Sequence, residues 1–170
     1  MNRTLADRLR CYLITDSRAE AVDSLVHRSA EALLGGMTAV QLRAPGWSDR
    51  RLLEAALRLR EVTREYNALL LLNDRIDLTL AAKADGVHLG VDDLPIATAR
   101  CLLGDGAIIG YSPDGLADAQ RAVADGASYL GVGPVFPTST KADAGEPIGV
   151  AGIRAITEAL AVPVVGVGGI

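Results

Sequence analysis

The sequence has few aromatic residues and no long hydrophobic run. Phenylalanine and tryptophan occur once each, and aromatic residues make up only 4% of the 170 residues. A core must therefore be built from Leu, Val, Ile and Ala, which the 49% hydrophobic content supplies. No apolar run reaches the roughly 18 residues that span a bilayer, and the first residues lack the apolar stretch of a signal peptide. We expect no membrane partner and a cytoplasmic location.

The chain also lacks a basic surface and a cysteine framework. Its net charge is −4, and the basic residues are scattered through helical stretches, so we expect no nucleic-acid partner. Cys11 and Cys101 lie in apolar surroundings and have no metal-type spacing. They predict two buried free thiols, which fit a reducing cytoplasm.

Short apolar runs alternate with helical patterns along the whole chain. Most of the runs are apolar nearly throughout, which is typical of parallel strands buried on both faces. The helical periodicity is clearest in 49–66, 114–124 and 149–160. The predicted strands are Cys11–Thr15, Ala39–Arg43, Ala68–Asn73, Gly86–Gly90, Ala107–Ser112, Tyr129–Gly133 and Pro163–Gly168.

This alternation predicts a single α/β domain over residues 1–170 with a parallel sheet. The count and even spacing of the strands favour a (β/α)8 TIM barrel over an open, doubly wound sheet. A complete barrel usually has about 250 residues, so we expect the eighth strand and its flanking helices to be missing from this sequence. The alternative is a seven-stranded open structure, which is disfavoured because it exposes two sheet edges.

Polar residues or glycines occur near the end of nearly every predicted strand. In parallel α/β folds, binding sites gather at the carboxyl ends of the strands. We therefore expect a ligand-binding rim, formed by Thr15, Asp16, Gln41, Arg43, Asn73, Asp74, Arg75, His88, Asp92, Asp93, Ser112, Thr138, Ser139, Thr140, Lys141, Gly168 and Gly169.

Several of these residues suit a phosphate group. Arg43 and Lys141 are cations that pair with phosphate oxygens, and the glycine pair 168–169 lets the backbone approach a ligand closely. In an extended loop, the spacing of Thr138 and Thr140 turns both hydroxyls to one side.

Asp74 and Asp93 follow neighbouring predicted strands beside these phosphate ligands. Carboxylates of this kind bind Mg²⁺ together with phosphate oxygens and water, so the sequence predicts a Mg²⁺-dependent enzyme that acts on phosphorylated compounds. The alternative is that each aspartate caps the helix that follows it.

Other polar residues have structural interpretations. Asp77 is expected on a helix surface and Asp85 in a turn. His88 lies inside a predicted strand, where a core histidine with satisfied hydrogen bonds is more common than a catalytic base. His27 lies on a charged helix face and is expected to be inert.

The order and spacing of several motifs resemble the thiamine phosphate synthase family. The resemblance runs from "YLITD" at residues 12–16 to "GVGGI" at residues 166–170. Between them lie "AVQLR", "LLNDRIDL", "ADGVHLGVDDLP", "IIGYS" and "GVGPVFPTSTK". The resemblance implies a (β/α)8 barrel that joins an aminopyrimidine diphosphate, 4-amino-5-hydroxymethyl-2-methylpyrimidine diphosphate, to a hydroxyethylthiazole phosphate or its carboxylate.

The resemblance also implies residue roles. The diphosphate leaves first, and Arg43, Lys141 and Ser112 are the residues expected to act in catalysis. Asp74 and Asp93 are the expected Mg²⁺ ligands. The expected substrate-binding residues are Gln41, Arg43, Asn73 and Ser112 for the pyrimidine diphosphate, Thr138, Thr140 and Gly169 for the thiazole phosphate, and Lys141 for the diphosphate.

Two positions depart from the family pattern. The family usually has Lys two residues after the arginine, where this chain has Pro45. It also commonly has Ser-x-His where this chain has Ser112 and Asp114. The resemblance implies that this histidine serves the related thiazole tautomerases, so its replacement favours the synthase. A tautomerase-like barrel enzyme and a non-catalytic protein that binds thiamine precursors stay as alternatives, and homo-oligomer formation is left open.

Overall fold

The computed structural model describes residues 3–15, 21–138 and 145–170, in which seven parallel strands alternate with helices. The strands are β1 (Tyr12–Ile14), β2 (Ala39–Leu42), β3 (Leu69–Asn73), β4 (Gly86–Leu89), β5 (Ile108–Tyr111), β6 (Tyr129–Val132) and β7 (Val164–Gly166). The helices are α1 (Leu5–Arg8), α2 (Val22–Leu34), α3 (Asp49–Glu65), α4 (Ile76–Ala81), α5 (Ile96–Leu103), α6 (Leu116–Ala124) and α7 (Gly149–Ala159).

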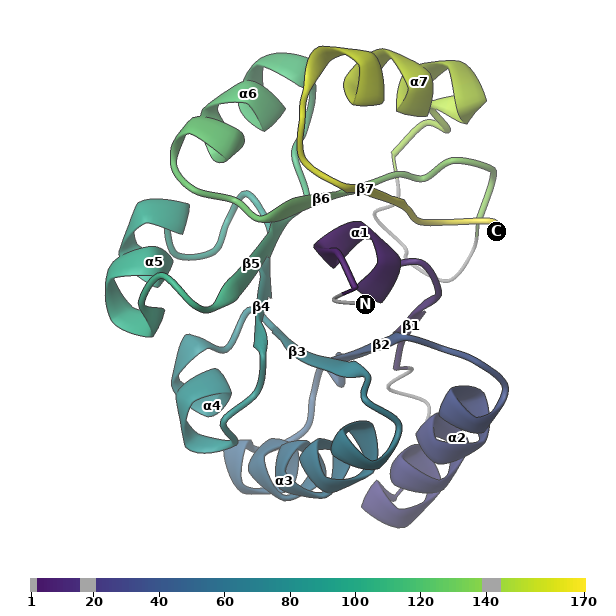
Figure 1. Cartoon of the computed structure of the whole chain (residues 1–170), viewed down its shortest axis with the longest axis vertical. Coiled ribbons are helices and arrows are strands. Elements are labelled where there is room, and N and C mark those ends of the chain that lie inside the picture. The colour runs from purple at the N-terminus through teal and green to yellow at the C-terminus, as the bar shows by residue number, and fades with distance from the viewer. Residues whose placement is uncertain (1–2, 16–20, 139–144) are drawn as a thin grey trace.

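Each strand pairs in parallel with the next one along the chain, so the sheet order is β1 to β7. Figure 1 shows this sheet curving into most of a ring, with α2 to α7 around the outside. The predicted TIM-barrel-like α/β fold is therefore confirmed, and the predicted strand and helix boundaries agree with the observed ones to within two residues. The eighth strand, and with it the domain boundary, stays a prediction.

The strands are apolar because both of their faces are buried. Leu70 and Leu72 of β3 pack outward in a cluster that includes residues of α2 and α3. Leu69 and Leu71 of the same strand belong to a separate, inner cluster. Successive side chains in a strand point to opposite faces, so this division follows from the alternation along β3.

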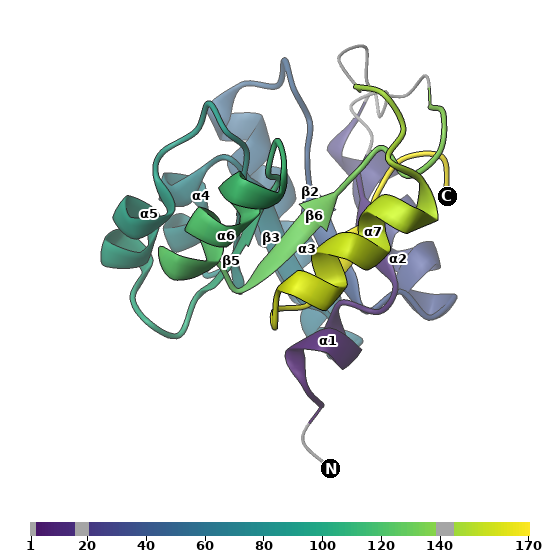
Figure 2. The same ribbon diagram turned by 90° about the horizontal axis from the view of Figure 1, so that it is seen from above.

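Helix α1 lies at the amino-terminal end of the barrel. Its N-cap residue Thr4 forms a capping box with Asp7, which fixes the first turn of this short helix. The residue after the helix, Leu9, is buried in the inner cluster. Figure 1 shows α1 in the middle of the ring, and Figure 2 places it at the opposite end of the barrel from the carboxyl end of β6. Among the described residues, no helix has both the length and the apolar character needed to cross a membrane.

The prediction of two buried thiols is wrong. Cys11 and Cys101 are free cysteines, but both are exposed. Cys101 lies on α5, whose buried residues are Ile96 and Ala99, so the cysteine falls on the other face of an amphipathic helix. Cys11 precedes β1, where its backbone bonds to Thr38 while its side chain stays in solvent.

Asp85 has the structural role that its position in a turn predicts. Its Oδ2 accepts a hydrogen bond from Arg60 Nη1 of α3 at 2.7 Å and another from the backbone N of Leu70 at 2.7 Å. Arg60 is 8% exposed, so this carboxylate compensates a buried cation. Asp77 is also structural, because it lies on α4 and pairs with Arg75.

We predict that Asp85→Ala destabilises the protein by about 3 kcal/mol, because it leaves the Arg60 guanidinium buried without its ionic partner. Urea unfolding followed by circular dichroism measures this change. The matched control is Asp23→Ala, which removes an exposed ion pair with Arg58 and should cost less than about 1 kcal/mol. Equal losses in the two variants would contradict the prediction.

Candidate active site

The predicted site residues that the structure describes lie at the same end of the barrel. Gln41 is in β2, Arg43 follows that strand, and Asn73 ends β3. Asp74, Asp93, Ser112, Thr138 and Gly169 lie after the strands that precede them, and all seven strands run parallel. Thr140, Lys141 and the neighbouring Ser139 lie outside the described residues, as does Asp16.

The end of β3 holds Asp74 in an unusual backbone conformation. Asp74 has a φ of 63°, in the left-handed region that costs most side chains energy but that Asp, Asn and Gly adopt more readily. Its backbone N donates to the carbonyl of His88 on β4 at 2.9 Å, and its Oδ2 accepts from Asn73 Nδ2 at 2.6 Å. The N-cap of α4 is Arg75 and not Asp74. The alternative that Asp74 occupies this capping position is therefore wrong.

Asp93 closes a tight turn after β4. Its Oδ2 accepts from the backbone N of Gly90 at 2.6 Å, and its own backbone N donates to the Gly90 carbonyl at 3.2 Å. The N-cap of α5 is Pro95, so Asp93 does not occupy the predicted capping position either. The turn instead fixes the carboxylate beside the carboxyl end of the strand.

The two aspartates fit a Mg²⁺ ion that arrives with a phosphorylated ligand. They follow β3 and β4, which are paired neighbours, and they provide the hard oxygen donors that Mg²⁺ prefers. Within the described ranges, no group of three or more His, Cys, Asp or Glu side chains could hold a metal. The remaining ligands would therefore come from phosphate oxygens and water, as is usual for Mg²⁺.

Inside the barrel, five side chains form one continuous line of hydrogen bonds. Gln41 Nε2 donates to the Tyr12 hydroxyl at 2.8 Å, and the hydroxyls of Tyr12 and Tyr129 are 2.7 Å apart. The Tyr129 hydroxyl is 2.8 Å from His88 Nδ1, and His88 Nε2 is 2.8 Å from Ser112 Oγ. The line thus joins Gln41 to Ser112, two residues predicted to bind substrate.

His88 is the satisfied core histidine that its position in a strand predicts. Both ring nitrogens have hydrogen-bond partners. Burial lowers the pKa of His88 to about 4, and the negative charge of Asp93 offsets this only in part. The ring is therefore neutral at neutral pH.

Tyr12 and Tyr129 are members of the site that the sequence patterns do not indicate. The available signal was a tyrosine inside an apolar strand, because a buried tyrosine hydroxyl requires a hydrogen-bond partner. Tyr129 is 1% exposed and is the largest of the fully buried side chains among the described residues.

Thr138 and the glycines after β7 lie close together. The loop after β6 pairs with the chain after β7, since Val135 N donates to Val167 O at 2.9 Å and Phe136 N donates to Gly168 O at 3.0 Å. A Cβ on Gly169, whose φ is 73°, would lie 2.7 Å from the Cβ of Phe136. A Cβ on Gly168 would lie 3.5 Å from Thr138 Cγ2. Glycine at both positions lets this backbone approach the loop.

Arg43 is half-buried at the rim. Its backbone N and O both bond to Thr15 Oγ1 at 2.9 Å, which fixes the start of the side chain. In the part of the chain that the structure describes, its guanidinium has no hydrogen-bond or ion-pair partner, so it is available to an anionic ligand. Pro45, which replaces the family lysine, lies in an exposed turn in which Trp47 N donates to Ala44 O at 3.2 Å.

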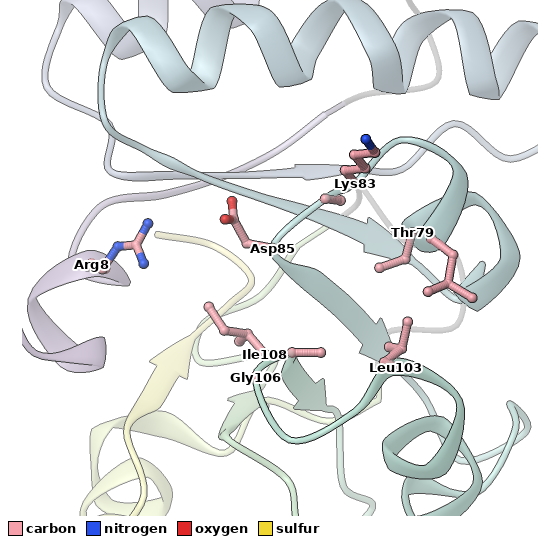
Figure 3. Close-up of a pocket in the computed structure, with 10 residues that line it drawn as sticks. Arg8, Thr79, Lys83, Asp85, Leu103, Gly106 and Ile108 are labelled. Carbon is pink, nitrogen blue, oxygen red and sulfur yellow. The ribbon is translucent and has the colours of Figure 1, made fainter.

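A pocket of about 450 Å³ lies at the opposite end of the barrel. Figure 3 shows Arg8, Lys83 and Asp85 around it. The residues that line it come from α1, from the segments that precede β4 and β5, and from the start of β5, and Asp85 is already paired with Arg60. This pocket is therefore separate from the rim.

The fold and the rim together define a TIM-barrel-like protein with a site suited to a phosphorylated ligand. The family described as thiamine monophosphate synthase matches residues 11–170. A thiamine-phosphate synthase of Chloroflexus aurantiacus is 47% identical over 95% of this chain and 74% of its own length. One of Clostridium novyi is 47% identical over 95% of this chain and 79% of its own.

A solved structure gives the same result. A thiamine phosphate pyrophosphorylase from Pyrococcus furiosus superposes with a TM-score of 0.87 at 42% identity, over 98% of this chain and 78% of that one. The chain belongs to the thiamine monophosphate synthase family.

We predict that the burial of His88 makes the protein less stable in mild acid. The pKa of His88 is lowered from 6.5 to about 4 on folding. Below pH 6.5 the unfolded chain therefore takes up a proton that the folded protein does not. The free energy of unfolding should fall by up to about 1.4 kcal/mol per pH unit between pH 6.5 and 4, and this contribution should be flat above pH 6.5.

Urea unfolding at several pH values measures this effect. His88→Gln is the control, because it keeps every other titrating group and removes this one. The wild-type protein should show the steeper loss of stability, and identical slopes would contradict the prediction.

Proposed function

We propose that the protein is a thiamine-phosphate synthase, a transferase that joins two phosphorylated precursors and releases diphosphate. The observation that carries this proposal is 47% identity to a thiamine-phosphate synthase over 95% of the chain. The position of the predicted site residues at one end of the barrel supports it.

In the proposed reaction, the bond between the pyrimidine methylene carbon and the diphosphate oxygen breaks first. Its electron pair leaves with the diphosphate, and the electron-rich aminopyrimidine stabilises the methylene cation. The thiazole nitrogen then donates its lone pair to this carbon, which forms the new C–N bond of thiamine phosphate. The protein needs no side-chain nucleophile for these steps.

The pyrimidine diphosphate is bound by residues at the carboxyl ends of β2, β3 and β5. Gln41, Arg43 and Asn73 hold the pyrimidine diphosphate, and Ser112 contacts the pyrimidine. Arg43 is suited to this role because its guanidinium provides fixed, always charged donors. As the leaving group gains charge, Arg43 and Lys141 stabilise it more strongly than they stabilise the bound substrate.

Asp74 and Asp93 would hold the Mg²⁺ ion of the proposed site. When bound, this ion supplies positive charge that neutralises the oxygens of the departing diphosphate. The hydrogen bond from Asn73 and the turn at Gly90 orient the two carboxylates. This part of the proposal is supported by the neighbouring strand ends and by the oxygen donors.

The thiazole phosphate is bound by Thr138, Thr140 and the backbone of Gly169. The backbone hydrogen bonds between the loop after β6 and the chain after β7 support this assignment. The substrates are small phosphorylated molecules, and a cytoplasmic location is part of the proposal.

The test of this function is the formation of thiamine phosphate and diphosphate from the two precursors with added Mg²⁺. We predict Mg²⁺-dependent turnover that Asp74→Asn and Asp93→Asn reduce by at least tenfold at fixed Mg²⁺, since each removes a charged ligand. Asp92→Asn is the control, because Asp92 is exposed and has no role in the proposed site. Tight binding of both precursors without turnover would instead identify a non-catalytic protein, and isomerisation of the thiazole alone would identify a tautomerase.

A second prediction separates the two phosphate sites. Thr138→Val should raise the KM for the thiazole phosphate about 10- to 100-fold, the effect of losing a hydrogen bond to a charged group. Lys141→Ala should mainly lower kcat, because the charge that the lysine meets grows in the transition state. Ser139→Ala is the control and should change little, since the side chain between the two threonines is expected to point away from them. Full kcat in Lys141→Ala, combined with lost activity in Ser139→Ala, would refute these roles.

A further inference from the structure

The line of hydrogen bonds inside the barrel begins and ends at proposed substrate-binding residues. Gln41 is 2% exposed and forms one end, while Ser112 is exposed at the rim and forms the other. The three residues between them, Tyr12, Tyr129 and His88, have no role in the proposed reaction. All four hydrogen bonds are between 2.7 and 2.8 Å long.

Two glycines provide the space for this line. A Cβ on Gly110 would lie 2.1 Å from the ring of Tyr129, and a Cβ on Gly131 would lie 2.8 Å from Cε1 of His88. Neither distance is compatible with a side chain at that position. The barrel interior therefore accommodates the two rings only because β5 and β6 carry glycine beside them.

The protons available on the five side chains determine which group donates and which accepts in each hydrogen bond of the line. We call this the direction of the line. The Tyr12 hydroxyl accepts from Gln41 Nε2, so its own proton is free to go to Tyr129. Tyr129 then donates its proton to His88 Nδ1, which leaves the histidine proton on Nε2, facing Ser112 Oγ. In this arrangement each tyrosine hydroxyl both accepts one hydrogen bond and donates one.

The opposite direction leaves one hydroxyl without an acceptor. If His88 Nδ1 carried the proton and donated to Tyr129, then Tyr129 would donate to Tyr12. Tyr12 would then accept two hydrogen bonds, and its own proton would have no acceptor among the described residues. A buried donor without an acceptor is costly, so the direction from Gln41 to Ser112 is favoured.

We propose that Tyr12, Tyr129 and His88 are positioning residues that fix the Ser112 hydroxyl as a hydrogen-bond donor to the substrate. Because His88 donates to Ser112 Oγ, the proton of Ser112 points away from His88 and toward the rim. Its partner must then be an acceptor, such as a nitrogen of an aromatic ring. The contact with the pyrimidine rests on the proposed function, whereas the direction of the line does not.

The ionisation states agree with this arrangement. Burial raises the pKa of Tyr12 to about 12 and raises that of Tyr129 well above its ordinary value. Both phenols therefore keep their protons at neutral pH, and the His88 ring is neutral.

The first test observes the histidine directly, in the full chain without substrate. Long-range ¹H–¹⁵N correlation spectra distinguish the two neutral tautomers of histidine. His27 is exposed and is the only other histidine in the sequence, so it serves as the internal reference. We expect His88 to carry its proton on Nε2. A proton on Nδ1 would overturn the proposal whether or not the protein is a synthase.

The second test measures kinetics in variants that remove a single oxygen. Tyr129→Phe should raise the KM for the pyrimidine diphosphate about 3- to 10-fold, as expected for one lost hydrogen bond, and leave the KM for the thiazole phosphate unchanged. Tyr12→Phe should have a smaller effect, because the bond from Tyr129 to His88 remains. Tyr111→Phe is the matched control, since Tyr111 precedes Ser112 but bonds to Asp118 outside the line.

A third set of variants distinguishes positioning from general stability. His88→Gln retains an amide that can donate to Ser112 and should keep the KM for the pyrimidine diphosphate within about 3-fold, whereas His88→Leu should raise it as much as Ser112→Ala does. The double variant, which combines His88→Leu with Ser112→Ala, should have a KM for the pyrimidine diphosphate no higher than that of Ser112→Ala alone. Additive losses, or equal changes in the KM of both substrates, would overturn the proposal. If the wild-type protein shows no turnover, the proposed function fails, and the tautomer of His88 still decides the direction of the line.

Discussion

The limited space inside the barrel is the constraint on which the site depends. The inward-facing side chains of all the strands share this space, and only some of them can be large. Tyr129 and His88 fit because Gly110 and Gly131 lie beside them without side chains. Their rings then connect β1, β2, β4, β5 and β6 through one line of hydrogen bonds. The polar interior of the barrel is thus a consequence of where the glycines are.

Much of the fold was predictable because parallel strands and amphipathic helices have strong patterns. Runs such as residues 69–72 are apolar on both faces, since one face meets the helices and the other meets the barrel interior. The rim was predictable for a related reason. In a parallel sheet, every residue that follows a strand lies at the same end, so Asn73, Asp74 and Ser112 could be grouped before their contacts were known.

The details of the site were not predictable in the same way. Tyr12 and Tyr129 are 117 positions apart, and no local pattern shows that their hydroxyls meet. The turn that Asp93 closes with Gly90 depends on the backbone after β4 and not on the spacing to the next helix. Cys101 was placed in the core from its apolar neighbours, although the helix turns it outward. In each case, the deciding factor was the orientation of a side chain in three dimensions.

The left-handed backbone conformation at Asp74 limits the types of residue that can occupy this position. The conformation admits aspartate, asparagine and glycine at low cost and penalises almost every other residue. In the proposed site, this position also provides a carboxylate for Mg²⁺, and aspartate alone satisfies both demands. Glutamate, the usual conservative replacement, would keep the charge but strain the chain. Under the proposed function, position 74 should therefore tolerate no exchange, whereas Asp93, which does not have a positive φ, is limited by its chemistry alone.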